Sequence, residues 1–255
     1  RRNFSPRLAF FTLLASSSSF SFYQALLNHI PAAFAMVLGL FATDQFLRGR
    51  LASAVLLLAL SFYTHIGIPW VFGLAVLFYG LIDREKKRGA LLFLFSSVIL
   101  SSPMLLKELS SLKYISTLGF SLGESQLCQF KVVEYILAAA GVFFAFRNKG
   151  RHIFLFAFFL ASLIFLAYPY RFFSAEGYLA IIFLCGLALS ELSVILANRI
   201  KWRASLTVLM LIFLVFLSPT ISGYKIKEGV FSYRVKIPDS AFMGALFAKG
   251  DSMWA

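Results

Sequence analysis

Residues 48–88 read RGRLASAVLLLALSFYTHIGIPWVFGLAVLFYGLIDREKKR, two apolar runs enclosed by basic clusters. The runs cover 51–65 and 67–82, and the linking sequence THIGIP at 64–69 contains the Gly and Pro that favour a tight turn. Both runs are short for the roughly 20 apolar residues that cross a bilayer. We therefore predict a helical hairpin whose tip lies in the membrane interface.

The same alternation of apolar run and short connection extends along the chain in both directions. It predicts an all-α, polytopic integral membrane protein with about nine transmembrane helices. The first segment is interrupted by Ser16 to Ser19, so we expect it to be bent or partly re-entrant. The predicted segments are 8–27, 30–47, 51–65, 67–82, 90–107, 131–146, 152–169, 175–198 and 203–222.

The composition excludes a soluble globular protein. Of 255 residues, 60% are hydrophobic and 14% are charged, and the mean hydropathy is +0.84. The net charge of +13 does not predict a nucleic-acid partner, because the cations cluster between apolar runs. Cys128 and Cys185 predict neither a disulfide framework nor a metal site, because they form no CxxC pair and Cys185 lies within an apolar run.

The basic residues predict the orientation of the chain in the membrane. Every second connection is basic, and the intervening connections hold only Lys107, Lys113, Lys131 and Arg171. This alternation follows the positive-inside rule, so we predict that the basic connections are cytoplasmic. Their cations are Arg1, Arg2, Arg7, Arg48, Arg50, Arg84, Lys86, Lys87, Arg88, Arg147, Lys149, Arg151, Arg199, Lys201 and Arg203.

The remaining connections are then extracytoplasmic. They include the turns near His29 and His65, the 108–130 loop and the turn before Glu176. A loop as long as 108–130 is uncommon unless it is functional or disordered. Residues 230–237 alternate with period 2, which predicts the start of a strand. We therefore expect a transmembrane helical domain at 1–222 and, at 223–255, an extracytoplasmic tail that begins a truncated soluble domain.

The chain ends suggest a fragment. The sequence has no initiator Met, and it stops at Ala255 soon after an apolar stretch. Residues 8–27 lack the pattern of a signal peptide and are predicted to be a membrane helix.

The sequence YPYRFF at 168–173 places Arg171 among aromatic residues in a short external turn. The planar guanidinium can donate two parallel hydrogen bonds, which suits a phosphate or pyrophosphate. The alternative is an interfacial aromatic belt with a snorkelling cation. As substrate-binding candidates we take Arg171, Tyr168, Tyr170 and Glu176.

His65 and His29 are the other external candidates. Either could bind a phosphate or sugar hydroxyl or relay a proton. The alternative is that they cap helices or bond to backbone, and the spacing between them implies no metal site.

The Asp and Glu residues support fewer conclusions about function. Asp44 and Arg48 are spaced for an i,i+4 ion pair near the cytoplasmic surface. Glu191 lies deeper and is the best indication of a transporter, since an intramembrane carboxylate is a functional candidate by default. Glu134 lies near the external end. Glu108 and Glu124 bound or occupy the 108–130 loop, where we expect them to be solvated. The chain has no P-loop, GxGxxG, HExxH or GxSxG motif.

Residues 42–54, ATDQFLRGRLASA, followed by LSFYTHI at 60–66, resemble the middle part of the GT-C class of membrane glycosyltransferases. This class includes oligosaccharyltransferase catalytic subunits and polyprenyl-phosphate-mannose-type transferases. YRFF at 170–173, with the apolar sequence after Tyr178, is similar to the family's late Arg-Phe helix start, whose Arg is associated with the phosphate of the lipid-linked donor. The 108–130 loop is similar in placement to the mobile external loop of the oligosaccharyltransferase branch. The resemblance covers residues 5–250.

The resemblance implies an enzyme that takes a sugar from a polyprenyl-phosphate or polyprenyl-pyrophosphate donor on the extracytoplasmic face. One departure is clear. The family's catalytic and metal-binding acids lie in the first external loop, and this chain has no Asp or Glu before Asp44. Either that loop precedes Arg1 in a longer protein, which we favour, or the chain is not an active transferase. Any catalytic base and any Mn²⁺ or Mg²⁺ site would then lie outside this sequence, and the fragment alone would be inactive.

Three other functions stay open. A lipid-modifying enzyme of another class, such as an acyltransferase, would share the predicted topology. A secondary transporter or permease would depend on Glu191. A non-catalytic membrane scaffold would tolerate replacement of Arg171 by Lys or Gln. The sequence identifies neither the sugar nor the acceptor.

Overall fold

The computed structural model of the chain describes residues 4–19, 30–115, 132–148, 150–167, 172 and 176–199. These residues are helical and contain no strand. The helices are α1 Pro6–Ser18, α3 Ile30–Leu47, α4 Leu51–Thr64, α5 Ile68–Ile82, α6 Lys87–Leu100, α7 Ser102–Ile115, α8 Val132–Asn148, α9 Ile153–Ser162 and α11 Leu179–Arg199. Short 3-10 helices cover Arg84–Lys86, Gly150–His152, Leu163–Ala167 and Glu176–Tyr178. The all-α prediction is therefore confirmed for this part of the chain.

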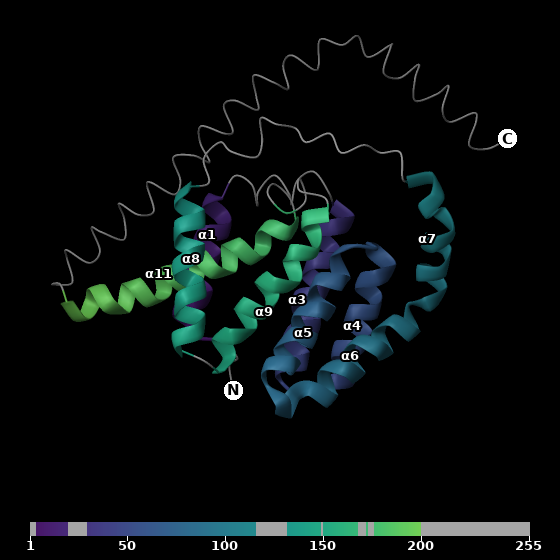
Figure 1. Cartoon of the computed structure of the whole chain (residues 1–255), viewed down its shortest axis with the longest axis horizontal. Coiled ribbons are helices and arrows are strands. Elements are labelled where there is room, and N and C mark those ends of the chain that lie inside the picture. Colours follow the sequence, from purple (N-terminus) through teal and green to yellow (C-terminus); the bar gives the residue numbers. More distant parts are fainter. Residues whose placement is uncertain are drawn as a thin grey trace, which may run out of the picture.

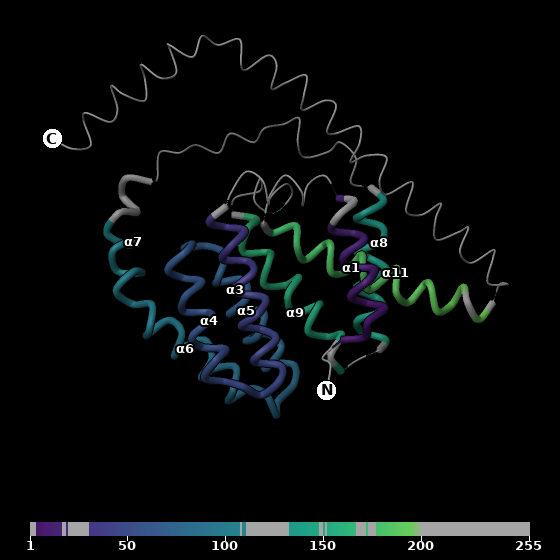
Figure 2. The backbone as a smooth tube through the Cα atoms, turned by 180° about the vertical axis from the view of Figure 1, so that it is seen from behind, coloured from purple at the N-terminus to yellow at the C-terminus, as the bar shows by residue number. Residues whose placement is uncertain are grey.

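The helices form a bundle in which most neighbours run side by side. The main pairs are α3 with α4 and α5 with α9, while α11 packs against both α1 and α8. Figure 1 shows α11 crossing α8 obliquely, and Figure 2 shows the same arrangement from behind. Because α11 contacts α1, α8 and α9, residues distant in sequence meet along it.

The connections between helices gather at two ends of the bundle. The start of α1 and the α3–α4, α5–α6 and α8–α9 connections lie together at the lower end in Figure 1. We call this the basic end, because it carries Arg7, Arg48, Arg50, Arg84 and Arg147. The α4–α5 turn and the starts of α8 and α11 lie at the upper end, which we call the His65 end. Among the described residues, these basic connections therefore lie apart from the α4–α5 turn, and the predicted membrane topology stays a prediction.

Close approaches between helix backbones hold the bundle together. A side chain at Gly141 on α8 would collide with the backbone of Leu184 on α11, and one at Gly186 would collide with Thr12 on α1. Glycine is therefore required where α11 crosses its two neighbours, as is common when small residues let helices pack closely. The closest approaches coincide with the most extensive contacts of α11.

The outer surface of the bundle is apolar. Phe10, Leu13, Phe95, Ile99 and Ile136 each expose at least 60% of their surface. Large apolar side chains are exposed on most of the described helices, including α3, α4, α6 and α8. Soluble monomers rarely expose contiguous apolar patches of large size, so this surface suits lipid contact.

The length of each helix tests whether it could cross a membrane. Within the described residues, α11 is long and apolar enough to span a bilayer, over Leu179–Leu196. The shorter apolar helices are Pro31–Leu47, Leu51–Thr64, Ile68–Ile82 and Ile153–Leu166. The structure therefore supports one membrane-capable helix, and a count of nine stays a prediction. Segment 203–222 and the predicted tail 223–255 lie outside the described residues.

Two predicted segments have different boundaries in the structure. Segment 90–107 is not one helix, because the chain breaks at Ser101 between α6 and α7. Pro103 explains the break, since it has no N–H to bond to the carbonyl four residues earlier, in α6, and its ring crowds that carbonyl. The predicted loop 108–130 is also wrong in its first part, because α7 continues to Ile115.

The first helix is shorter than predicted. It ends at Ser18 rather than running to residue 27, and Ser19 is its C-cap. The serine run explains this end, because serine hydroxyls compete for backbone partners. Ser16 Oγ, for example, donates to the Leu13 carbonyl at 2.8 Å.

Candidate functional site

A buried carboxyl group lies at the His65 end of the bundle. Glu134 is in the first turn of α8 and exposes only 4% of its surface. Ser19 Oγ at the end of α1 donates to Glu134 Oε2 over 3.3 Å. Cys185 Sγ on α11 donates to the Glu134 carbonyl oxygen over 3.1 Å. Residue 134 therefore connects three helices that are far apart in the sequence.

Two tyrosines surround this carboxyl group. Tyr178, fully buried, lies beside Glu134 at the start of α11. Its ring packs edge to face against Tyr135, with centroids 6.3 Å apart. We call Glu134, Ser19, Tyr135, Tyr178 and Cys185 the Glu134 cluster. Because a buried carboxyl group is costly without polar partners, the hydrogen bond from Ser19 helps to keep Glu134 inside the bundle.

The sequence placed Glu134 near the external end of its segment and did not predict its burial. A signal for burial was present. Leu137, Ala138, Gly141 and Ala145 follow Glu134 at helical spacing, and all are buried on one face of α8. Glu134 is the first member of this stripe, so its side chain must point toward α1 and α11.

His65 occupies the turn between α4 and α5. Its Nδ1 accepts hydrogen bonds from the backbone N–H groups of Gly67 at 3.0 Å and Ile68 at 3.2 Å. These donors are at the start of α5, where backbone N–H groups lack partners within the helix. His65 therefore caps α5, in agreement with the backbone-bonding alternative.

The other predicted site residues are only partly described. Glu176 begins the 3-10 helix that leads into α11, and this short helix touches α3. Arg171, Tyr168, Tyr170 and His29 lie outside the described residues. The structure thus brings the backbone at Glu176 and His65 to the same end of the bundle as the Glu134 cluster (Figure 1).

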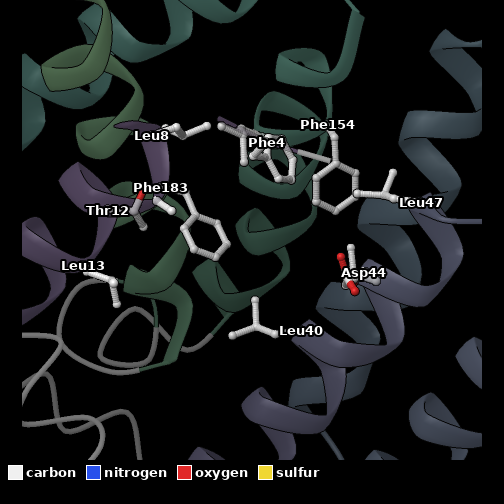
Figure 3. A pocket seen from close by; sticks show the side chains of 12 residues that line it. Phe4, Leu8, Thr12, Leu13, Leu40, Asp44, Leu47, Phe154 and Phe183 are labelled. Carbon is white, nitrogen blue, oxygen red and sulfur yellow. The ribbon is translucent and has the colours of Figure 1, made fainter. Parts of the chain in front are cut away.

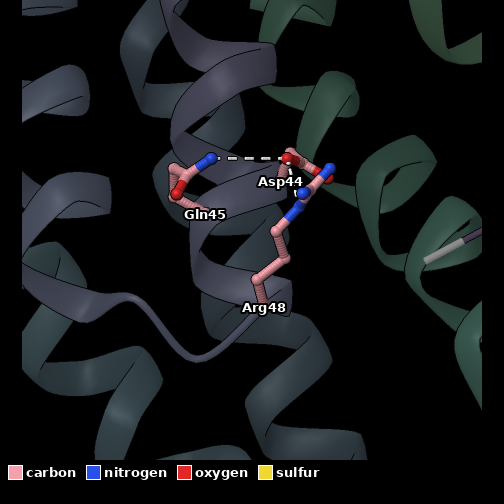
Figure 4. A network of polar contacts seen from close by, with 3 residues as sticks. All are labelled: Asp44, Gln45 and Arg48. Carbon is pink, nitrogen blue, oxygen red and sulfur yellow. Dashed lines mark hydrogen bonds and ion pairs between the residues drawn. The ribbon is translucent and has the colours of Figure 1, made fainter. Parts of the chain in front are cut away.

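The predicted ion pair between Asp44 and Arg48 is confirmed. Arg48 Nε lies 2.7 Å from Asp44 Oδ2, one turn apart on α3. Gln45 Nε2 also donates to Asp44 Oδ2 over 3.5 Å (Figure 4). The pair is at the basic end, far along α3 from Ile30 at the His65 end. It neutralises Asp44 rather than forming part of the Glu134 cluster.

A largely apolar groove runs beside this ion pair. It has a volume of about 400 Å³ and lies among α1, α3, α9 and α11. Figure 3 shows Leu13 and Leu40 toward one end of the groove, Phe4 and Leu47 toward the other, and Asp44 at its side. The lining residues are Phe4, Leu8, Ala9, Thr12, Leu13, Leu40, Thr43, Asp44, Leu47, Phe154, Leu155 and Phe183.

No metal centre emerges in the part of the chain that the structure describes, where no group of three or more His, Cys, Asp and Glu side chains could hold an ion. Glu191, the sequence candidate for a transport residue, is partly buried on α11. The chain matches no family model, and no curated protein or solved structure is similar to it at a significant level.

Proposed function

We propose that this chain is a polytopic membrane protein of the GT-C glycosyltransferase type. It takes a sugar from a polyprenyl-phosphate or polyprenyl-pyrophosphate donor on the extracytoplasmic face, which corresponds to the His65 end. The observation that carries the proposal is the polarity of the bundle. Its basic connections gather at one end, whereas the Glu134 cluster and the His65 turn lie at the other. The resemblance of residues 42–54, 60–66 and 170–173 to the GT-C class supplies the reaction type.

The orientation follows from the positive-inside rule. With the basic end in the cytoplasm, the predicted connection around Arg171 is assigned to the extracytoplasmic side. The apolar outer surface of the bundle gives a polyprenyl chain a favourable place beside the protein. This arrangement allows the donor to stay in lipid while its phosphate reaches the His65 end.

The reaction is a displacement at the anomeric carbon: a nucleophilic atom of the acceptor forms the new glycosidic bond, and the bond from that carbon to the phosphate oxygen breaks, so that polyprenyl phosphate or pyrophosphate leaves. Negative charge develops on the leaving phosphate, and the Arg171 guanidinium stabilises it through paired hydrogen bonds. Tyr168 and Tyr170 shape the pocket, with His65 fixing the adjacent α4–α5 turn.

The test compares two arginines that the predicted topology places on opposite sides of the membrane. Arg171→Ala should weaken binding of a polyprenyl-phosphate ligand by at least tenfold, since loss of a charge-assisted hydrogen bond removes about 1.5–3 kcal/mol. Arg84→Ala, at the basic end, is the matched control and should change binding little. Binding is measured by titration of the purified chain in nanodiscs. Equal losses in the two variants would refute the placement of the donor site.

Burial of Glu134 favours one second candidate, a proton-coupled secondary transporter. A buried carboxyl group within a helical membrane bundle is a common proton-binding element. This function predicts that Glu134→Gln abolishes uptake of a solute while leaving polyprenyl-phosphate binding unchanged. The transferase proposal predicts no proton-driven uptake in vesicles.

A further inference from the structure

The outer face of α6 carries a cation at its start and apolar side chains along the rest of its length. Arg88, Leu92, Phe95 and Ile99 are spaced i, i+4, i+7 and i+11, so they lie on one face of the helix. All four are exposed, and Phe95 and Ile99 expose 61% and 68% of their surface. The rest of α6 packs against α4 and α5, so this face forms an edge of the bundle (Figure 1).

The cations at the start of α6 outnumber the acids around them. Segment 83–88, DREKKR, contains four cations and two carboxylates. Within the part of the chain that the structure describes, none of these four cations forms an ion pair, and all of them are exposed. The start of α6 therefore presents an excess of positive charge to its surroundings.

The face is as long as one leaflet of a bilayer. From Arg88 to Ile99 the helix rises by about 16 Å, at roughly 1.5 Å per residue. The hydrocarbon core of a bilayer is about 30 Å thick, so one leaflet contributes about 15 Å. A phospholipid whose phosphate lies beside Arg88 can therefore extend an acyl chain along the whole face.

We propose that the outer face of α6 binds an anionic phospholipid from the leaflet at the basic end, with the headgroup phosphate beside Arg88 and an acyl chain along Leu92, Phe95 and Ile99. The inference rests on the membrane embedding in the proposed function and is independent of sugar transfer. Arg can hold a phosphate through paired hydrogen bonds, and nearby cations attract an anionic headgroup. Phosphatidylcholine also carries a phosphate, but its choline cation would meet the same excess of positive charge.

Two other occupants fit this face less well. An acidic soluble protein would use the cations and leave Leu92, Phe95 and Ile99 uncovered. In a two-fold dimer within one membrane, the face would meet its own copy. The cations at the two α6 starts would then lie close together, and like charges disfavour such an interface.

Photo-crosslinking can locate the lipid on the whole chain. The photoreactive residue p-benzoylphenylalanine is placed at Phe95 on α6 or, as the control, at Leu56 on α4. Leu56 exposes 57% of its surface and lies at a similar distance along its helix from the basic end, but residue 52, one turn before it, is an alanine. Because both positions are exposed, the substitutions leave the core in place, and a single symmetric peak in size-exclusion chromatography checks this.

Each protein is purified from the membrane fraction and reconstituted with equal amounts of dioleoyl phosphatidylglycerol and dioleoyl phosphatidylcholine. Mass spectrometry then gives the ratio of the two lipids among the crosslinked products. We expect phosphatidylglycerol to be favoured at least fivefold more at position 95 than at position 56. Equal ratios at the two positions would overturn the inference, and so would crosslinks from position 95 to protein instead of lipid.

Two charge variants, each combined with the photoreactive residue at position 95, test the headgroup contact. Arg88→Gln should lower the preference for phosphatidylglycerol roughly fivefold, as expected for the loss of one nearby cation. Arg7→Gln removes an exposed cation from α1, which packs mainly against α11, and should keep the preference. An unchanged preference in Arg88→Gln, or an equal loss in both variants, would overturn the inference.

The failure of this inference can be distinguished from the failure of the proposed function. Recovery of the chain outside the membrane fraction would overturn both. Equal lipid ratios at positions 95 and 56 of a membrane-embedded chain would overturn the α6 site alone.

Discussion

His65 shows how a single side chain can serve the structure at a position expected to bind substrate. The imidazole ends α4 and accepts the first two free N–H groups at the start of α5. Because both donors are backbone N–H groups, this position requires a side chain that can bring a hydrogen-bond acceptor to them.

Substitutions at His65 separate capping from substrate binding. His65→Leu should reduce the free energy of unfolding by about 1 kcal/mol, because two backbone donors lose their acceptor. His65→Asn should recover most of that loss, since a side-chain amide oxygen can accept the same bonds. Thermal unfolding in detergent measures both. If His65 also binds the donor, the Asn variant will be stable and yet bind polyprenyl phosphate weakly.

Glu134 is the second residue whose environment decides its role. Its carboxyl group accepts from Ser19 and lies in a protein interior with 4% of the residue exposed. Glu134→Ala should lower the free energy of unfolding by about 1–3 kcal/mol, because it leaves the Ser19 hydroxyl without this acceptor. Glu134→Gln keeps an acceptor oxygen and should lose less than about 1 kcal/mol.

Chemical unfolding of the purified protein measures the Glu134 variants. Glu85→Ala, at an exposed position between α5 and α6, is the control and should not change stability. Equal stability of Glu134→Ala and Glu85→Ala would contradict a structural role for the cluster.

At the scale of elements, the crossing of α8 and α11 depends on the absence of a side chain at Gly141. The space that a Cβ atom would need is filled by the Leu184 backbone, which cannot move aside as a flexible side chain could. The most extensive contact of α11 is the one it makes with α8, and it contains the Cys185 bond to residue 134. The Glu134 cluster and the α8–α11 crossing therefore depend on the same helix packing.

Gly141→Val should force α8 and α11 apart and lower the free energy of unfolding by about 1–3 kcal/mol. Ala139→Val is the control, because residue 139 is exposed on the same helix and bears the same cost of a β-branched side chain. Helix propensity favours Val over Gly and Ala over Val, so a lower melting temperature in Gly141→Val than in Ala139→Val reports the crossing. No difference would show that the helices do not approach closely at this point.

Helix positions were predictable from the sequence where an apolar run ends in a charged or glycine-containing turn. The segments 30–47, 51–65 and 67–82 agree with α3, α4 and α5 to within a residue or so at each end. The break at Ser101 and the early end of α1 were missed, because hydropathy does not respond to a single Pro or to hydroxyl groups that compete for backbone bonds.

The candidate site was less predictable than the helices. The ion pair of Asp44 and Arg48 is local, so its spacing was sufficient. The Glu134 cluster joins residues 19, 134, 178 and 185, and no local pattern indicates that α1, α8 and α11 meet there. Contacts of this kind depend on helix packing, which a single sequence does not specify.

At the scale of the whole molecule, the two ends of the bundle should face opposite sides of a membrane. Cysteine labelling tests this in a Cys128→Ser background, where Cys185 is buried. A cysteine at the exposed Glu85 should react with an impermeant maleimide only after the cells are opened, whereas one at Ile66 should react in intact cells. Labelling of both positions from the same side would contradict the proposed topology.

The α3–α4 turn has a consequence for how the protein is made. It consists of Arg48, Gly49 and Arg50, and Gly49 adopts a φ of 80°, which residues with a side chain rarely adopt. The two helices it joins make the most extensive contact among the described helices. Such a short-range pairing closes quickly, because little chain entropy is lost. During synthesis this hairpin can form as soon as both helices have left the ribosome, and the later helices can assemble on it as a template.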